Sequence, residues 1–211
     1  IESLPKSILF WRSMTQWIGG MGIIVLTIAI LPLLGIGGME LFVAEAPGPT
    51  KDKIHPRIKE TAKRLWIIYF SLTALETVVL MFFGLSFFDA INHSLTTTST
   101  GGFSTKQESI AAFQNPFVEA VIVIFMFLAG TNFTMIYFGL KMKFRKIVNN
   151  DEFKWYLSAV FILILLLSFY RTHTSSSDFI HAFREISFQV VSIITTTAVS
   201  YTHLTLPTTG I

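Results

Sequence analysis

Four long apolar runs, separated by polar segments, dominate the pattern of this chain. They cover residues 13–39, 65–88, 120–140 and 155–170. A helix that crosses a bilayer needs about 20 consecutive apolar residues, and the first three runs meet this length. The fourth has only 16 residues, but Lys154 and Arg171 flank it, and their long side chains can reach the membrane interface. The pattern therefore predicts four transmembrane helices.

A fifth apolar stretch, residues 179–197, differs from the other four. Its apolar positions are interrupted by the polar residues His181, Arg184, Glu185 and Gln189. Charged side chains are rare on lipid-facing helices and face the protein interior or water. This stretch is therefore predicted to be a re-entrant helix buried in protein.

Residues 96–105, between the second and third runs, read Thr-Thr-Thr-Ser-Thr-Gly-Gly-Phe-Ser-Thr. A loop of this kind would leave its backbone polar groups unsatisfied in lipid, so it is tolerated only where it is buried or lines a water-filled path. Glycine permits backbone dihedrals that aim successive carbonyls at one axis, and carbonyl rings replace the hydration shell of a cation in selectivity filters. The segment is therefore predicted to be a pore loop.

The arrangement is repeated along the chain. Residues 87–98 and 179–197 are both helix-like, and both run into threonines. Ser86, with Asp89 three residues later, and Asp178 are candidate N-caps for the two helices. Such helices point the negative ends of their dipoles into the membrane, which favours a cation. The predicted fold is an all-α membrane protein of repeated membrane–pore helix–membrane hairpins, with about four transmembrane helices and two re-entrant pore helices.

Composition indicates a membrane protein, and the distribution of basic residues predicts which loops lie in the cytoplasm. Hydrophobic residues make up 52% of the chain, charged residues make up 14%, and there is no cysteine and hence no disulfide framework. Eleven of the 16 Lys and Arg residues lie in the loops 40–64 and 141–154. The positive-inside rule places both loops in the cytoplasm, so the threonine–glycine segment enters the membrane from outside.

Five motifs give the chain a family resemblance. They are Phe-Trp-Arg-Ser-Met-Thr-Gln-Trp-Ile-Gly-Gly-Met-Gly at 10–22, Ala-Glu-Ala-Pro-Gly-Pro-Thr-Lys-Asp-Lys at 44–53, Gly-Gly-Phe-Ser-Thr at 101–105, Ala-Gly-Thr-Asn-Phe at 129–133 and Phe-Gln-Val-Val-Ser at 188–192. With these motifs the chain resembles the Trk/Ktr/HKT superfamily of potassium transporters, and most closely the bacterial Trk-type subunits. The resemblance implies four repeats around one pore, a multi-pass protein of the bacterial inner membrane, a homodimer and cytoplasmic nucleotide-binding regulatory subunits.

The resemblance also implies a division of the chain. Residues 1–61 correspond to the inner helix of the first repeat and a cytoplasmic loop, 62–150 to the complete second repeat, and 151–197 to the outer helix and pore helix of the third. Residues 200–211 look unrelated to the family and resemble a translated sequencing adapter, so we expect a non-native tail over 198–211. The alternative is a real substitution of the family's filter glycine.

The site residues follow from the same resemblance. Carbonyls near each filter glycine are expected to bind potassium, which is the only metal expected, and the residues concerned are Thr100, Gly101, Gly102, Thr196 and Thr197. Ala198-Val199 stands where the family pattern has a glycine and an aromatic residue. Phe103 and Asn132 are candidate pore-lining residues, and for Asn132 a hydrogen bond to a neighbouring helix is the favoured interpretation.

The predicted function is potassium uptake through a filter of backbone carbonyls, without enzymatic chemistry, cofactor or nucleic acid. An alternative is a broken-helix secondary transporter for another small cation or solute, a class that has inverted repeats. Glu76, an acid inside the second run, is a functional candidate by default, but a hydrogen bond to a neighbouring helix is the favoured interpretation. The sequence leaves open selectivity for potassium over sodium, symport with another ion, and gating.

Overall fold

Helices form the described part of the molecule. A computed structural model describes residues 1, 3–30, 54–175 and 178–199, and no β-strand occurs within these ranges. The elements are α1 (Lys6–Ile30), α3 (Ile54–Phe82), α4 (Phe87–Thr98), the 3₁₀ turn η2 (Ile110–Phe113), α5 (Pro116–Ala129), α6 (Phe133–Leu140), α7 (Phe144–Val148), α8 (Asp151–Ser175) and α9 (Phe179–Ile194). The predicted all-α fold is confirmed.

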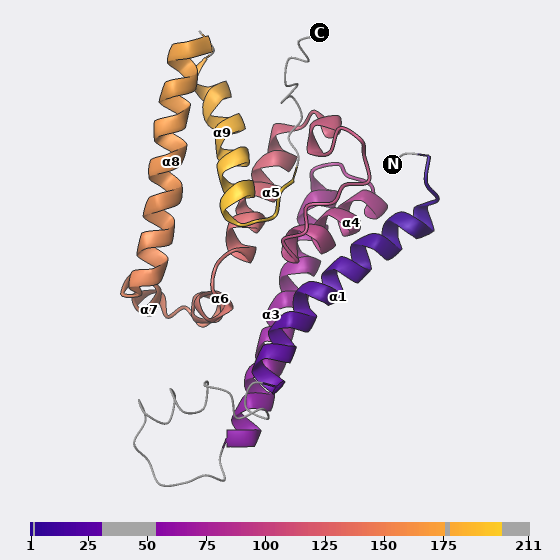
Figure 1. The fold of residues 1–211 in the computed structure, drawn as a ribbon, viewed down its shortest axis with the longest axis vertical. Helices are drawn as coiled ribbons and strands as arrows, with labels where there is room; N and C mark the ends of the chain where they lie inside the picture. Colours follow the sequence, from indigo (N-terminus) through magenta and orange to yellow (C-terminus); the bar gives the residue numbers. More distant parts are fainter. Residues whose placement is uncertain (2, 31–53, 176–177, 200–211) are drawn as a thin grey trace, which may run out of the picture.

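The helices alternate in direction along one long axis (Figure 1). Helix α3 begins near one end of the molecule and α7 lies at the lower end of α8, whereas α4 and α9 begin toward the opposite end. Both short helices therefore enter from the end away from the basic residues of α7. This is the arrangement that the charge pattern predicts.

Two of the described helices are long and apolar enough to cross a membrane. They are residues 63–82 of α3 and residues 151–174 of α8, and α5 is a shorter apolar helix. The second segment contains the predicted run 155–170. The first covers residues 65–82 of the predicted run 65–88, whose end is wrong, because α3 ends at Phe82 and residues 87–88 begin α4. Helix α1 covers the first part of the predicted 13–39 run, and residues 31–39 lie outside the described residues.

The third predicted run is not one helix, so the expectation of a continuous helix over 120–140 is wrong. Helix α5 ends at Ala129, and α6 begins at Phe133. Gly130 is the C-cap and donates its N–H to the Met126 carbonyl at 2.9 Å, while the Thr131 hydroxyl donates to the Leu128 carbonyl at 2.7 Å. Glycine is a poor helix former, and the side-chain hydroxyl offers the backbone a local alternative to the helix ladder.

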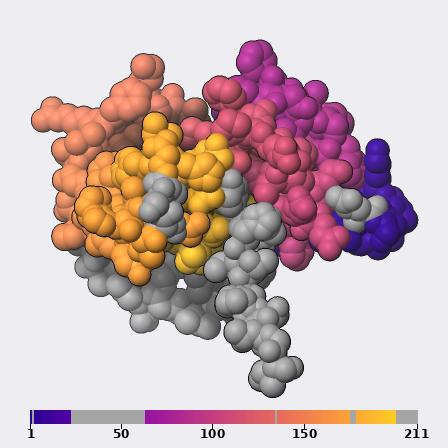
Figure 2. Space-filling model, turned by 90° about the horizontal axis from the view of Figure 1, so that it is seen from above, coloured from indigo at the N-terminus to yellow at the C-terminus, as the bar shows by residue number. Residues whose placement is uncertain are grey.

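The core lies between α3, α5, α8 and α9. Leu80, Ile122, Met126 and Phe188 are fully buried there. Helix α8 also presents a broad apolar face outward, with Leu166 and Phe169 more than half exposed. In the space-filling view this helix forms the side of the molecule opposite α1 (Figure 2). In a membrane protein such a face contacts lipid.

Candidate functional site: two re-entrant loops

Helix α4 ends in a run of buried hydroxyl residues. Ser94 and Ser99 each donate a hydrogen bond of 2.8 Å to the backbone carbonyl four residues earlier. These bonds satisfy the hydroxyls without water. At the other end of the helix Ser86 is the N-cap, and its side chain accepts from the Asp89 N–H at 3.1 Å. The cap predicted from the sequence is confirmed.

The loop after α4 is tied back onto the helix. The N–H groups of Gly101 and Gly102 both donate to the Thr96 carbonyl, at 2.7 and 3.3 Å. The Thr96 hydroxyl in turn donates to the Phe103 carbonyl at 2.8 Å. Thr100 and Gly102 have positive φ angles of 52° and 67°. Alternate residues of this loop thus adopt the left-handed conformation.

The loop after α9 has the same construction, shifted by 96 residues. Thr196 and Ala198 have φ angles of 56° and 52°. The Ala198 N–H donates to the Ser192 carbonyl at 3.0 Å, and the Ser192 hydroxyl donates to the Val199 carbonyl at 3.1 Å. Asp178 occupies the N-cap position of α9, as predicted, but its side chain makes no capping hydrogen bond.

The shift places Ala198 at the position that Gly102 has in the first loop. A left-handed backbone costs a residue other than glycine about 1–2 kcal/mol. The departure from the family pattern that the sequence reveals at Ala198 therefore falls on a position where the backbone favours glycine.

The two loops lie against each other. A Cβ atom added to Gly102 would lie 2.0 Å from the Thr197 carbonyl oxygen and 2.9 Å from the Ala198 carbonyl carbon. Only a residue without a side chain allows this approach. The structure therefore brings the predicted filter residues of both segments together, whereas their coordination of potassium stays a prediction.

Helix α1 contributes two polar side chains to the first loop, and the sequence reasoning did not assign them a role. The Gln16 side-chain N–H donates to the Gly101 carbonyl at 2.9 Å. The Arg12 guanidinium donates to the Ser104 carbonyl at 2.5 Å, and its centre lies 4.6 Å from that of the exposed Phe103 ring. Both residues belong to the 10–22 motif, which was the available signal.

The Asp89 carboxylate binds the segment that follows the first loop, at Thr105. Asp89 accepts hydrogen bonds of 2.7 Å from the hydroxyls of Ser86 and Thr105. Burial raises the pKa of Asp89, but these two bonds and the nearby His93 and Lys106 together hold its pKa below the usual value. Asp89 is therefore an anion at neutral pH.

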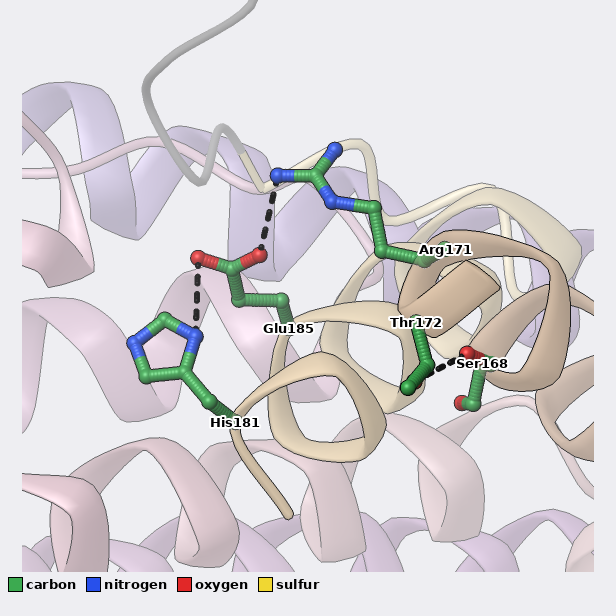
Figure 3. A network of polar contacts seen from close by, with 5 residues as sticks. All are labelled: Ser168, Arg171, Thr172, His181 and Glu185. Carbon is green, nitrogen blue, oxygen red and sulfur yellow. Dashed lines mark hydrogen bonds and ion pairs between the residues drawn. The ribbon is translucent and has the colours of Figure 1, made fainter. Parts of the chain in front are cut away.

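Charged side chains also connect α9 to its neighbours near its outer end. Glu185 of α9 lies 3.4 Å from the Arg171 guanidinium of α8 and 3.5 Å from Nδ1 of His181 (Figure 3). Arg184 pairs with the buried Glu119 of α5 at 3.0 Å. The remaining candidate, Asn132, lies exposed in the break between α5 and α6.

Two loops of this kind, each after a short helix that packs against apolar helices, are typical of membrane transport proteins of the pore-loop class. Residues 1–196 match the TrkH family of cation transport proteins. The chain is 45% identical over 202 residues to the Trk system potassium uptake protein TrkH of Escherichia coli K12, covering 93% of this chain and 41% of the relative. It is 41% identical over 189 residues to TrkG of the same organism, covering 87% and 39%.

A solved structure of the same family also matches this chain. The crystal structure of the potassium transporter TrkH from Vibrio parahaemolyticus matches with a TM-score of 0.75 and 38% identity, over 91% of this chain and 39% of that one. The chain belongs to the TrkH family of cation transport proteins. It spans about two fifths of the length of the curated relatives it matches.

Proposed function

We propose that the protein carrying this chain takes up potassium across the bacterial inner membrane through a filter of backbone carbonyls. The observation that carries the proposal is the contact between two loops of equal construction, at residues 100–103 and 196–199. Each follows a helix whose negative dipole end points inward, which favours a cation over an anion. The relatives named above are potassium uptake proteins, which supports potassium as the ion.

A chimera tests this proposal. Residues 1–196 would replace the matching segment of the Escherichia coli relative, and growth of a potassium-uptake-deficient host would be measured at low potassium. We expect the chimera to restore growth, as the parent protein does. A chimera that reaches the membrane in normal amount without restoring growth would contradict the proposal.

The direction of the loops argues against the broken-helix secondary transporter. That class has inverted repeats. Here α4 and α9 both begin at the same end of the molecule and point the same way (Figure 1). Parallel repeats support a pore surrounded by equivalent segments.

The topology gives a second prediction, with the loop 141–154 in the cytoplasm. In a cysteine-free full-length protein, Lys146→Cys should react with a membrane-impermeant thiol reagent only from the cytoplasmic side, and Gln107→Cys only from outside. Both positions are exposed and lie in the segments that the charge rule separates. Labelling with the two sides exchanged would overturn the proposed orientation.

We also propose that regulatory subunits with nucleotide-binding domains dock on the basic cytoplasmic side, and that the pore protein forms a homodimer. An open, shallow pocket near α6 and α7 supports the docking site, because three basic residues line it together with apolar and amide side chains: Lys143, Arg145, Lys146, Met135, Phe138, Asn149 and Asn150. Acidic surfaces on such a subunit would complement this lining. The proposed transport itself uses no cofactor.

A further inference from the structure

A tyrosine joins three helices directly behind the first loop. Tyr69 of α3, only 1% exposed, donates its hydroxyl to the Trp17 carbonyl of α1 at 3.0 Å, and the two rings lie 5.2 Å apart. One turn further along α1, a Cβ on Gly20 would lie 3.0 Å from both the Tyr69 hydroxyl and the Ser99 Cβ. The hydroxyl, the glycine and the cap of α4 therefore meet at one point.

We call this contact of a tyrosine hydroxyl, a glycine and a helix cap a tyrosine joint. A second tyrosine joint lies behind the second loop. Tyr156 of α8 donates to the Phe127 carbonyl of α5 at 3.4 Å, and their rings stack at 4.9 Å. A Cβ on Gly130 would lie 3.0 Å from the Tyr156 hydroxyl and 2.6 Å from Thr195 Cγ2. Thr195 caps α9 as Ser99 caps α4.

The correspondence runs through three different sequence shifts. Trp17 and Gly20 match Phe127 and Gly130 with a shift of 110 residues, Tyr69 matches Tyr156 with 87, and Ser99 matches Thr195 with 96. Because the three shifts differ, the matching residues do not belong to one contiguous repeated segment. The two joints therefore share a geometry that arises where three separate helices pack together.

Each joint touches the start of a filter segment. Ser99 and Thr195 immediately precede Thr100 and Thr196, the first left-handed residues of the two loops. A shift of either cap would displace the carbonyls that follow it. In a carbonyl filter, small displacements of this kind change which ion is preferred, because selectivity depends on the size of the cavity or on the field of its dipoles.

We infer that Tyr69 and Tyr156 are positioning residues whose hydroxyls brace the bases of the two filter segments and thereby maintain preference for potassium over sodium. The inference rests on the proposed function. The first joint has an additional bond, from the Trp17 indole N–H to the Thr73 hydroxyl at 2.9 Å. Val160 holds the place of Thr73 in α8 under the shift of 87. The second joint therefore depends more on its tyrosine.

The experiment deletes single hydroxyl groups in the full-length chimera. Tyr156→Phe keeps the ring that stacks on Phe127, and Tyr69→Phe makes the matching change in the first joint. Tyr170→Phe is the control, because this residue lies on the same helix as Tyr156 and is 66% exposed. The permeability ratio of potassium to sodium would be measured in proteoliposomes, together with total cation flux and the amount of inserted protein.

We expect Tyr156→Phe to lower the ratio roughly threefold to tenfold, the range for the loss of one net hydrogen bond, with total flux retained. Tyr69→Phe should lower it less, and Tyr170→Phe should leave it unchanged. An unchanged ratio in Tyr156→Phe, or failure of that variant to insert, would overturn the inference while leaving the proposed function intact. Absence of potassium flux in the unmodified chimera would instead overturn the proposed function, and the inference with it.

Discussion

Gly102→Val in the full-length chimera is expected to abolish potassium uptake while the protein still inserts into the membrane. Gly102 has a φ of 67°, and a Cβ there would lie 2.0 Å from the Thr197 carbonyl oxygen. A β-branched residue is an outlier in this conformation, and the atom it meets is backbone that cannot rotate away. The two loops must therefore separate, which displaces both predicted filter segments.

The effect should be on the order of a hundredfold or more in uptake rate, because a barrier increase of about 1.4 kcal/mol already gives a factor of ten. Gly19→Val in α1 is a matched control, since an added Cβ there meets no atom within 4 Å. Rubidium uptake into potassium-depleted cells measures both variants. Normal uptake by Gly102→Val would show that the proposed filter does not include this residue.

Glu76→Lys should prevent accumulation of the folded protein, whereas Glu76→Gln should be tolerated. Glu76 lies in the membrane-spanning part of α3 with no exposed surface, and Thr97 and Thr98 of α4 are its polar neighbours. The uncharged amide of the glutamine variant can replace the carboxyl group here, because it can form hydrogen bonds with these hydroxyl groups. An ammonium group without a carboxylate partner would carry a desolvation penalty of about several kcal/mol.

The amount of protein that elutes as a single species after detergent extraction measures this outcome. We expect at least roughly a tenfold decrease for the lysine variant, which corresponds to about 1.4 kcal/mol, and near-normal recovery for the glutamine variant. Equal recovery and uptake for the two variants would mean that Glu76 reaches water in the full-length protein. The preference for an interhelical role of Glu76 would then be wrong.

The sequence was sufficient for the features that depend on local pattern. Apolar runs predict the spans in α3 and α8, and the threonine run with Gly101 and Gly102 predicts the loop after α4. Ser86 was identifiable as a cap because its partner, Asp89, lies only three residues away. The repeat was visible because both short helices run into threonines.

Features that depend on long-range packing could not be predicted in this way. The break at Gly130 was missed because hydropathy does not distinguish a glycine that ends a helix from one inside an apolar run. Gln16 and Gly101 are 85 residues apart, so their hydrogen bond depends on how α1 packs against α4. The tyrosine joints were missed for the same reason, since each combines residues from three helices.

The joints have a consequence for how such a chain can diverge after duplication. Thirty positions separate Tyr69 from Ser99, but 39 separate Tyr156 from Thr195, and the interval from glycine to tyrosine is 49 positions in one joint and 26 in the other. The connecting segments therefore differ in length by 9 and 23 residues, while the contacts among the four matching residues are the same in both joints. Loop length has a weak effect on stability, so insertions outside the membrane are nearly neutral. The contacts within each joint are thus the part of the repeat that is kept. The segments between the joints can change in length and sequence, and can therefore form binding surfaces for other proteins.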